Sequence, residues 1–207
     1  MCFDFKTSIT TLSIGTIFNI IGLILYKNVE YLPFVIIWQW ALLMQLFDAI
    51  AWKTQNCNKT NQKVAKMAYV ANITQPIIIF MSFILISKVS MNFKLISTMV
   101  ISLYIIQLFY QSTNVDFKCL TPKKDCKYLN YKWWDNINII GYMIALFTMF
   151  LFLARPFVLS IINVIYIIIT LIISSRIYKC GAASIWCWFA SFAPLINIVA
   201  YKYIQKS

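Results

Sequence analysis

Apolar residues form long stretches along the chain, separated by short breaks that are rich in lysine. A bilayer core about 30 Å thick requires roughly 20 apolar residues per helix. Seven stretches approach that length, at residues 8–26, 32–52, 66–87, 93–111, 136–153, 157–175 and 182–203. Continuous apolar runs favour helices, because membrane strands would alternate in shorter segments. The pattern therefore predicts an all-α membrane protein, a bundle of seven transmembrane helices that forms one integral membrane domain over residues 1–207.

Composition supports this class. Hydrophobic residues make up 61% of the chain and charged residues 12%, with a mean hydropathy of +0.76. A soluble domain of 207 residues would need far more charge on its surface, so the lipid bilayer is the expected partner. The first stretch is longer than the apolar region of a signal peptide and lacks a small-x-small cleavage pattern. We expect it to be the first transmembrane helix.

Positive charge is distributed unequally between the two ends of the predicted bundle. Seven crossings would bring the N-terminus and the segments 53–66, 112–135 and 176–181 to one end, which we call the N-terminal face. This face would hold twelve of the 18 lysines and arginines, so the positive-inside rule favours a cytosolic N-terminus. The net charge of +12 does not indicate a nucleic-acid partner, because lysines beside membrane ends determine topology and contact anionic lipids.

The cysteines argue for the opposite orientation. Five of the six would lie at the N-terminal face, namely Cys2, Cys57, Cys119, Cys126 and Cys180. Clustered thiols suit disulfide bonds, which form on exoplasmic faces. Both orientations stay open, and the charge rule is preferred. Under that preference the "NKT" sequon at residues 58–60 would not be reached by the glycosylation machinery, and we expect Asn58 to carry no glycan.

Cys119 and Cys126 are close enough in sequence to close a small loop. Six residues separate them, and we predict a disulfide between them if the N-terminal face is exposed to an oxidising compartment. A zinc site of four cysteines would be the alternative. The chain lacks the close C-x2-C pairs that are typical of zinc sites, so we expect no metal.

Asp48, within "WQWALLMQLFDAIAW", is the only acidic side chain inside a long apolar stretch. At about 1.5 Å of rise per residue, Asp48 lies about 6 Å below the end of its helix and Gln45 about 11 Å below it. In the third predicted helix, Asn72 and Gln75 lie about 9 Å and 13 Å deep on the same scale. The matched depths predict that these four side chains meet.

Other helices carry polar or aromatic side chains at similar depth. Polar groups inside a membrane are costly, so they turn inward and pair or line a cavity. We therefore predict a polar pocket in the half of the bundle near the 53–66 and 112–135 loops. Its ligand-binding residues would be Gln45, Asp48, Asn72, Gln75, Tyr104, Gln107, Tyr142, Tyr166, Trp188 and Ser191.

A structural interpretation of Asp48 competes with the pocket. Asp48 would accept a hydrogen bond from Asn72 and thereby join the second and third helices. It would also pair with Lys53 or Lys66 near the membrane surface. Both interpretations stay open.

Two prolines lie inside predicted helices. Pro76 falls in the third helix and Pro194 in the seventh, and each is expected to kink its helix and free carbonyls that the bundle must satisfy. These positions would be equivalent in an internal repeat of three, one and three helices, as in transporters built from repeats.

Several classes of membrane protein are excluded by missing residues. The chain has no histidine, which excludes enzymes that use histidine as a metal ligand or base. It has one membrane aspartate, whereas an intramembrane aspartyl protease requires two. A retinal protein needs a lysine midway along the seventh helix, and Lys202 lies at the very end. We expect neither enzymatic activity nor a cofactor.

Four short motifs carry a resemblance to a known family. They are "MQLFDAIAW" at 44–52, the "NCNKTNQK" that follows closely, "QPI" at 75–77 and "WCWFASFAPLINI" at 186–198. The chain resembles an uncharacterised family of about seven membrane helices encoded by giant DNA viruses and some protists. In that family the acidic residue at the position of Asp48 is more often Glu. The resemblance implies a multi-pass protein of a host or virion membrane and adds no mechanism.

Two functions of different class follow. The first is a transporter or binding protein for a small solute or ion, with the pocket opening to the N-terminal face. The second is a structural membrane protein, for example of a viral envelope, whose polar residues only hold helices together. A cavity among the polar residues would favour the first, and fully paired side chains the second.

Overall fold

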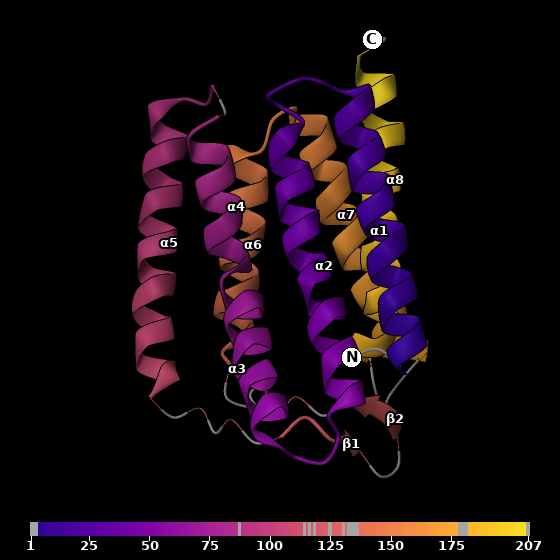
Figure 1. Ribbon diagram of the computed structural model, residues 1–207. Helices are drawn as coiled ribbons and strands as arrows, with labels where there is room; N and C mark the ends of the chain where they lie inside the picture. Colours follow the sequence, from indigo (N-terminus) through magenta and orange to yellow (C-terminus); the bar gives the residue numbers. More distant parts are fainter. Residues whose placement is uncertain are drawn as a thin grey trace.

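A computed structural model shows an upright bundle of helices with a small β-hairpin at one end (Figure 1). It describes residues 4–86, 88–113, 115, 117, 119–123, 126–129, 131, 137–177 and 182–205. The helices of this part of the chain are α1 (Phe5–Leu25), α2 (Leu32–Lys53), α3 (Lys59–Ile73), α4 (Gln75–Ile84), α5 (Met91–Ser112), α6 (Ile139–Leu153), α7 (Phe157–Ile177) and α8 (Ala182–Ile204). Two antiparallel strands, β1 (Pro122–Lys123) and β2 (Cys126–Leu129), form the hairpin.

Each of the seven predicted stretches contains helix, and the third contains two. The prediction of one helix over 66–87 is wrong, because α3 ends at Ile73, α4 begins at Gln75, and the two are bent by 46°. The physical reason is Pro76, which has no backbone N–H to offer to the preceding turn. Pro194, in contrast, lies inside the continuous helix α8.

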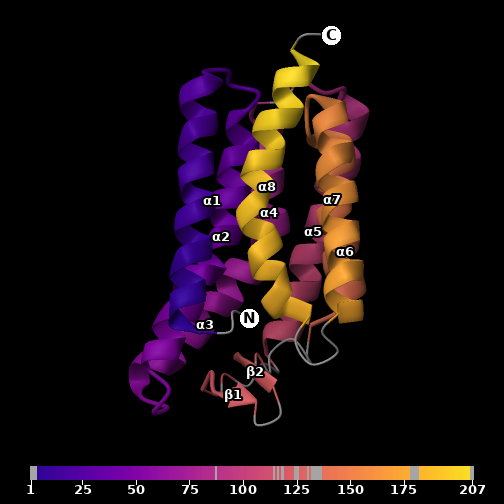
Figure 2. The same ribbon diagram turned by 90° about the vertical axis from the view of Figure 1, so that its right-hand side faces the viewer.

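Successive helices run in alternating directions, apart from α3 and α4, which follow one another along one path (Figure 1). The N-terminus and the hairpin therefore lie at one end of the bundle and the C-terminus at the other (Figures 1 and 2). Helix α1 packs against α2 and α8, α8 also packs against α7, and α6 packs against α4 and α5. Helix α5 is thus at the edge of the bundle.

The pattern of burial in α1 is the reverse of that in a soluble protein. Its buried residues are small or polar, namely Ser8, Thr11, Gly15, Asn19 and Gly22, while its isoleucines and leucines point outward. Small residues allow close helix packing inside membranes, where apolar side chains face lipid. A Cβ at Gly15 would lie 2.5 Å from the Leu42 side chain, so α1 and α2 are in close contact there.

The outer surface of the bundle is covered with large apolar side chains, especially on α1, α5 and α7. A soluble monomer rarely exposes such a continuous apolar surface. Among the described residues, four helices are long and apolar enough to cross a membrane, namely α1, α2, α5 and α7, and α3 with α4 would make a fifth span. The fold is compatible with a membrane-embedded protein.

A buried polar network joins α2, α7 and α8. The Trp38 indole N–H donates to Asn163 Oδ1 over 2.8 Å, and Asn163 Nδ2 donates to Asn197 Oδ1 over 2.7 Å. Asn163 Nδ2 also donates to the Leu159 carbonyl of its own helix. All these groups are buried, so the network satisfies polar atoms that would otherwise be stranded in the apolar interior.

The break between α3 and α4 is held by two aromatic side chains from neighbouring helices. The Trp40 indole N–H of α2 donates to the Ala71 carbonyl over 2.9 Å, and the Tyr104 hydroxyl of α5 donates to the Ile73 carbonyl over 2.8 Å. The end of a helix leaves carbonyls without intrahelical partners. The expectation that the bundle satisfies carbonyls freed near Pro76 is confirmed at these two positions.

Candidate functional site

A cavity of about 280 Å³ lies between α2, the α3–α4 break, α6, α7 and α8. Most of the lining is apolar, with side chains such as Met44, Ile79 and Leu146. The cavity follows α6 from Ile139 to Phe150, a rise of about 16 Å at 1.5 Å per residue. It is therefore elongated along the bundle axis, and its volume is just below the usual range for ligand sites, about 300 to 1,000 Å³.

Four of the ten predicted site residues line this cavity, namely Gln45, Asn72, Gln75 and Tyr142. Gln45 of α2 therefore lines the same cavity as Asn72 and Gln75, the residues of matched depth. The Tyr142 hydroxyl donates to Gln75 Oε1 over 2.6 Å, which links α6 to the start of α4. Gln45 Oε1 accepts from the Thr11 hydroxyl of α1 over 3.2 Å.

Asn72 differs from the other polar lining residues. It is 5% exposed, and its Oδ1 has no hydrogen-bond partner among the described residues. A buried acceptor without a donor costs on the order of 1 to 3 kcal/mol. Asn72 lies at the wall of the cavity, so a bound molecule with a donor would remove that cost once the amide turned its buried oxygen towards the cavity.

Asp48 lies elsewhere. It is fully buried but does not line the cavity, and its carboxylate accepts a hydrogen bond from the Tyr131 hydroxyl. Within the described part of the chain, a hydrogen bond to the Asp48 carboxylate comes from Tyr131, and none of the expected bonds joins Asp48 to Asn72 or Gln75. Asp48 instead ties α2 to the segment between α5 and α6.

The two lysines expected near Asp48 contact aromatic rings. Lys53 Nζ lies 4.3 Å from the centre of the Phe5 ring, and Lys66 Nζ lies 5.6 Å from that of Phe117. Both are cation–π contacts, with the ammonium groups at the rim of the N-terminal face.

The remaining predicted site residues lie outside the cavity wall. Tyr104 binds the Ile73 carbonyl, and Gln107 packs where α5 meets Gly141 of α6. The Tyr166 hydroxyl donates to the Phe189 carbonyl over 2.5 Å, which joins α7 to α8.

In α8, the Ser191 hydroxyl donates to the Trp188 carbonyl one turn earlier, and the Trp188 side chain is 37% exposed. The hydroxyls of Tyr104, Tyr166 and Ser191 are thus used in contacts within or between helices, whereas Gln107 Nε2 is buried without a partner among the described residues.

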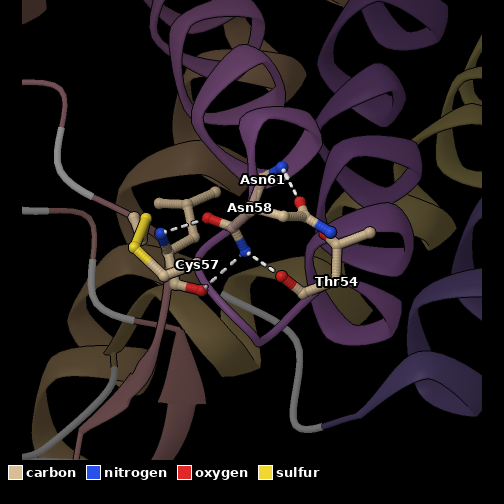
Figure 3. Close-up of a disulfide and its surroundings, with 6 residues drawn as sticks. Thr54, Cys57, Asn58 and Asn61 are labelled. Atoms are coloured by element: carbon tan, nitrogen blue, oxygen red, sulfur yellow. Dashed lines mark hydrogen bonds between the residues drawn. A yellow bond between two sulfur atoms is a disulfide. The ribbon is translucent and has the colours of Figure 1, made fainter.

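A tight set of contacts holds the α5–α6 segment against the start of α3 (Figure 3). Asn61 is fully buried, and its Nδ2 donates to the carbonyls of Thr54 and Leu120 over 2.9 and 3.1 Å. The Leu120 N–H donates back to Asn61 Oδ1 over 2.7 Å, so the Asn61 amide binds both the N–H and the carbonyl of Leu120. Asn58 caps α3 by accepting from the Asn61 backbone N–H.

The disulfide of this region differs from the predicted one. Cys119 is bonded to Cys57 of the α2–α3 loop, so the predicted Cys119–Cys126 pair is wrong. The reason is that Asn61 fixes the backbone next to Cys119 beside the α2–α3 loop, which places the two Cα atoms 5.3 Å apart. The side chains of Cys126 and Cys180 lie outside the described part of the chain.

Sequence reasoning missed three residues that organise the interior. Asn163 and Asn197 lie within apolar stretches just as Asp48 does, so the same signal could have identified them. Tyr131 lies in an irregular segment without periodicity, and no sequence signal pointed to its contact with Asp48.

No protein family model, no curated protein and no solved structure matches this chain. The resemblance to the giant-virus family stays a prediction.

Proposed function

We propose that the chain is a multi-pass membrane protein that binds, and as a transporter moves, a small solute in the cavity between α2, α4, α6, α7 and α8. The observation that carries this proposal is a cavity of about 280 Å³ lined by Asn72, whose buried oxygen has no partner among the described residues. Concave, mostly apolar sites with a few polar groups are typical of ligand sites.

Seven crossings of the bilayer are part of the proposal. The alternating directions of the helices support it, with α3 and α4 together forming the third crossing (Figure 1). Helix α6 has 15 residues, about 22 Å, and would be the shortest crossing. The three-one-three repeat stays a prediction, because Pro76 lies at a break whereas Pro194 lies inside a continuous helix.

The test of binding is to fill the cavity. Ala190 of α8 lines the cavity and is buried, whereas Val199 of the same helix is 47% exposed. We expect small apolar solutes to raise the melting temperature of the purified protein, Ala190→Phe to abolish that increase, and Val199→Phe to keep it. An equal shift in wild type and Ala190→Phe would reject this cavity as the binding site.

The orientation follows from the disulfide in this proposal. Cys57–Cys119 lies at the N-terminal face, and disulfides persist in oxidising compartments, so we place that face on the exoplasmic side. This reverses the preference drawn from the lysine count. Lys63 is exposed on α3 at the same face, and Lys63→Cys should react with a membrane-impermeant maleimide on intact cells. Reaction only after permeabilisation would restore the cytosolic assignment.

A structural role in an envelope is the second candidate. The Trp38–Asn163–Asn197 network and the Tyr131–Asp48 bond favour it, because these buried polar groups are used to join elements. If this role is the whole function, the cavity variant Ala190→Phe would assemble into membranes and particles like wild type, and no solute would change the melting temperature.

A further inference from the structure

We propose that the ligand of the cavity is an uncharged, mainly apolar alcohol, whose hydroxyl group donates its hydrogen to the Asn72 side-chain oxygen. This inference rests on the proposed function and names the chemical class of the ligand. It follows from the charge of the lining, from the hydrogen-bonding groups that the protein has already used, and from the size and shape of the cavity.

The lining carries no Asp, Glu, Lys or Arg among the described residues. A charged ligand would lose its hydration in this cavity without a counter-charge, which costs far more than burying a neutral group. Asp48, the acidic residue within the apolar stretch of α2, could have supplied a counter-charge. It is outside the lining, and its carboxylate accepts a hydrogen bond from Tyr131. Carboxylates and ammonium groups are therefore poor ligands.

The protein itself uses several hydrogen-bond donors of the lining. The Trp38 indole donates to Asn163, the Trp40 indole to the Ala71 carbonyl, and the Tyr142 hydroxyl to Gln75. Among the described residues of the lining, the buried polar atom without a partner is an acceptor, Asn72 Oδ1. A ligand that satisfies it must supply a hydrogen.

The Asn72 amide is suited to a hydroxyl in particular. Its terminal torsion is broad, so the amide can turn its oxygen towards the cavity at little cost. The amide also has two N–H donors, and a hydroxyl has acceptor lone pairs as well as one hydrogen. An alcohol can therefore exchange hydrogen bonds with Asn72, whereas an ether can only accept.

The cavity dimensions favour a short, unbranched molecule. At about 30 Å³ for each group of the size of a water molecule, 280 Å³ accommodates roughly nine such groups. The extent of about 16 Å along α6 suits an extended chain better than a compact ring system. 1-Octanol matches both properties and is a suitable probe.

The experiment compares 1-octanol with its isomer 1-methoxyheptane and with octanoate. Binding to the full-length protein in detergent is measured by calorimetry or native mass spectrometry. We expect the alcohol to bind at least tenfold more tightly than the ether, and octanoate not to bind. Asn72→Leu should reduce alcohol affinity to that of the ether. The control Asn92→Leu, on an exposed position of α5, should leave the difference intact.

The outcomes separate the inference from the proposed function. Equal affinity for alcohol and ether in wild type would overturn the hydroxyl assignment while leaving the cavity as a binding site, and this comparison needs no variant. Tight binding of octanoate would overturn the uncharged class. Binding of none of the probes, or unchanged binding in Ala190→Phe, would overturn the proposed function as well.

Discussion

At the scale of single residues, Asp48 acts as an acceptor that anchors the segment between α5 and α6 to α2. Tyr131, which follows β2, donates to its carboxylate, and both side chains are buried. Asp48→Leu removes this acceptor and leaves the Tyr131 hydroxyl without that bond, so we expect a loss on the order of 1 to 3 kcal/mol in the free energy of unfolding. Asp48→Asn keeps an acceptor and should cost less.

A double-mutant cycle tests whether the effect passes through Tyr131. In the Tyr131→Phe background, Asp48→Leu should cost less than in wild type, with a coupling energy of roughly 0.5 to 3 kcal/mol. The measurement is chemical unfolding of the purified protein in detergent. Strictly additive losses would show that Tyr131 is not the partner that matters for stability.

Asp4, at the start of α1, predicts a dependence of stability on pH. Its carboxylate caps the helix by accepting from the Thr7 backbone N–H over 2.6 Å, and this bond is the main reason that the pKa of Asp4 is lowered. A carboxyl group whose pKa is lower in the folded state stabilises the protein above its unfolded pKa of about 3.9, and the contribution is lost as the pH falls through the folded value.

Asp4→Ala should therefore cost about 1 kcal/mol at neutral pH, the usual value of a helix cap. The gap between wild type and variant should close as the pH is lowered below about 4. Thermal unfolding as a function of pH measures this gap. A difference that stays constant down to pH of about 2 would contradict the assigned charge of the cap.

At the scale of elements, the α3–α4 break is stabilised by side chains from two other helices. Tyr104→Phe leaves the Ile73 carbonyl without its hydroxyl donor in an apolar interior, and we expect a loss on the order of 1 to 3 kcal/mol. Tyr110→Phe is the matched control, because Tyr110 lies on the same helix and is 78% exposed. Equal stability of the two variants would mean that the carbonyl at the break does not depend on Tyr104.

The elements also show what sequence alone can predict. The apolar runs located the helices because the length of a continuous apolar run is a local property of the chain. The break at Thr74 was expected only as a kink, because the donors that satisfy it, Trp40 and Tyr104, come from distant helices. The prediction of the disulfide partner of Cys119 was wrong for the same reason. The hydrogen bond between Asn61 and Leu120, rather than the short loop to Cys126, decides which cysteine lies next to Cys119.

Candidate site residues were predicted in part. Depth along the helices was sufficient to place Gln45, Asn72, Gln75 and Tyr142 near one another. Depth does not give the rotation of each helix about its axis, and rotation decides whether a side chain such as Asp48 faces the cavity or a neighbouring segment. Rotation depends on packing between helices, which a single sequence does not state.

At the scale of the whole molecule, the bundle has an apolar outer surface, small and polar residues between closely packed helices, and an elongated cavity between α2, the α3–α4 break, α6, α7 and α8. The first two features suit a lipid environment. The cavity adds a cost, because unfilled apolar volume lowers stability by about 24 cal/mol per Å³. Its presence beside Asn72, whose side-chain oxygen has no partner among the described residues, is the basis for assigning it a ligand.

Photolabelling with a diazirine derivative of 1-octanol tests that assignment most directly. After irradiation of the purified protein, digestion and mass spectrometry locate the labelled residues. We expect labels on α2 between Ile37 and Gln45 and on the facing part of α6, and competition by unlabelled 1-octanol should remove them. Labels confined to the outward-facing sides of α1, α5 and α7, or labels unaffected by competitor, would contradict a ligand site inside the bundle.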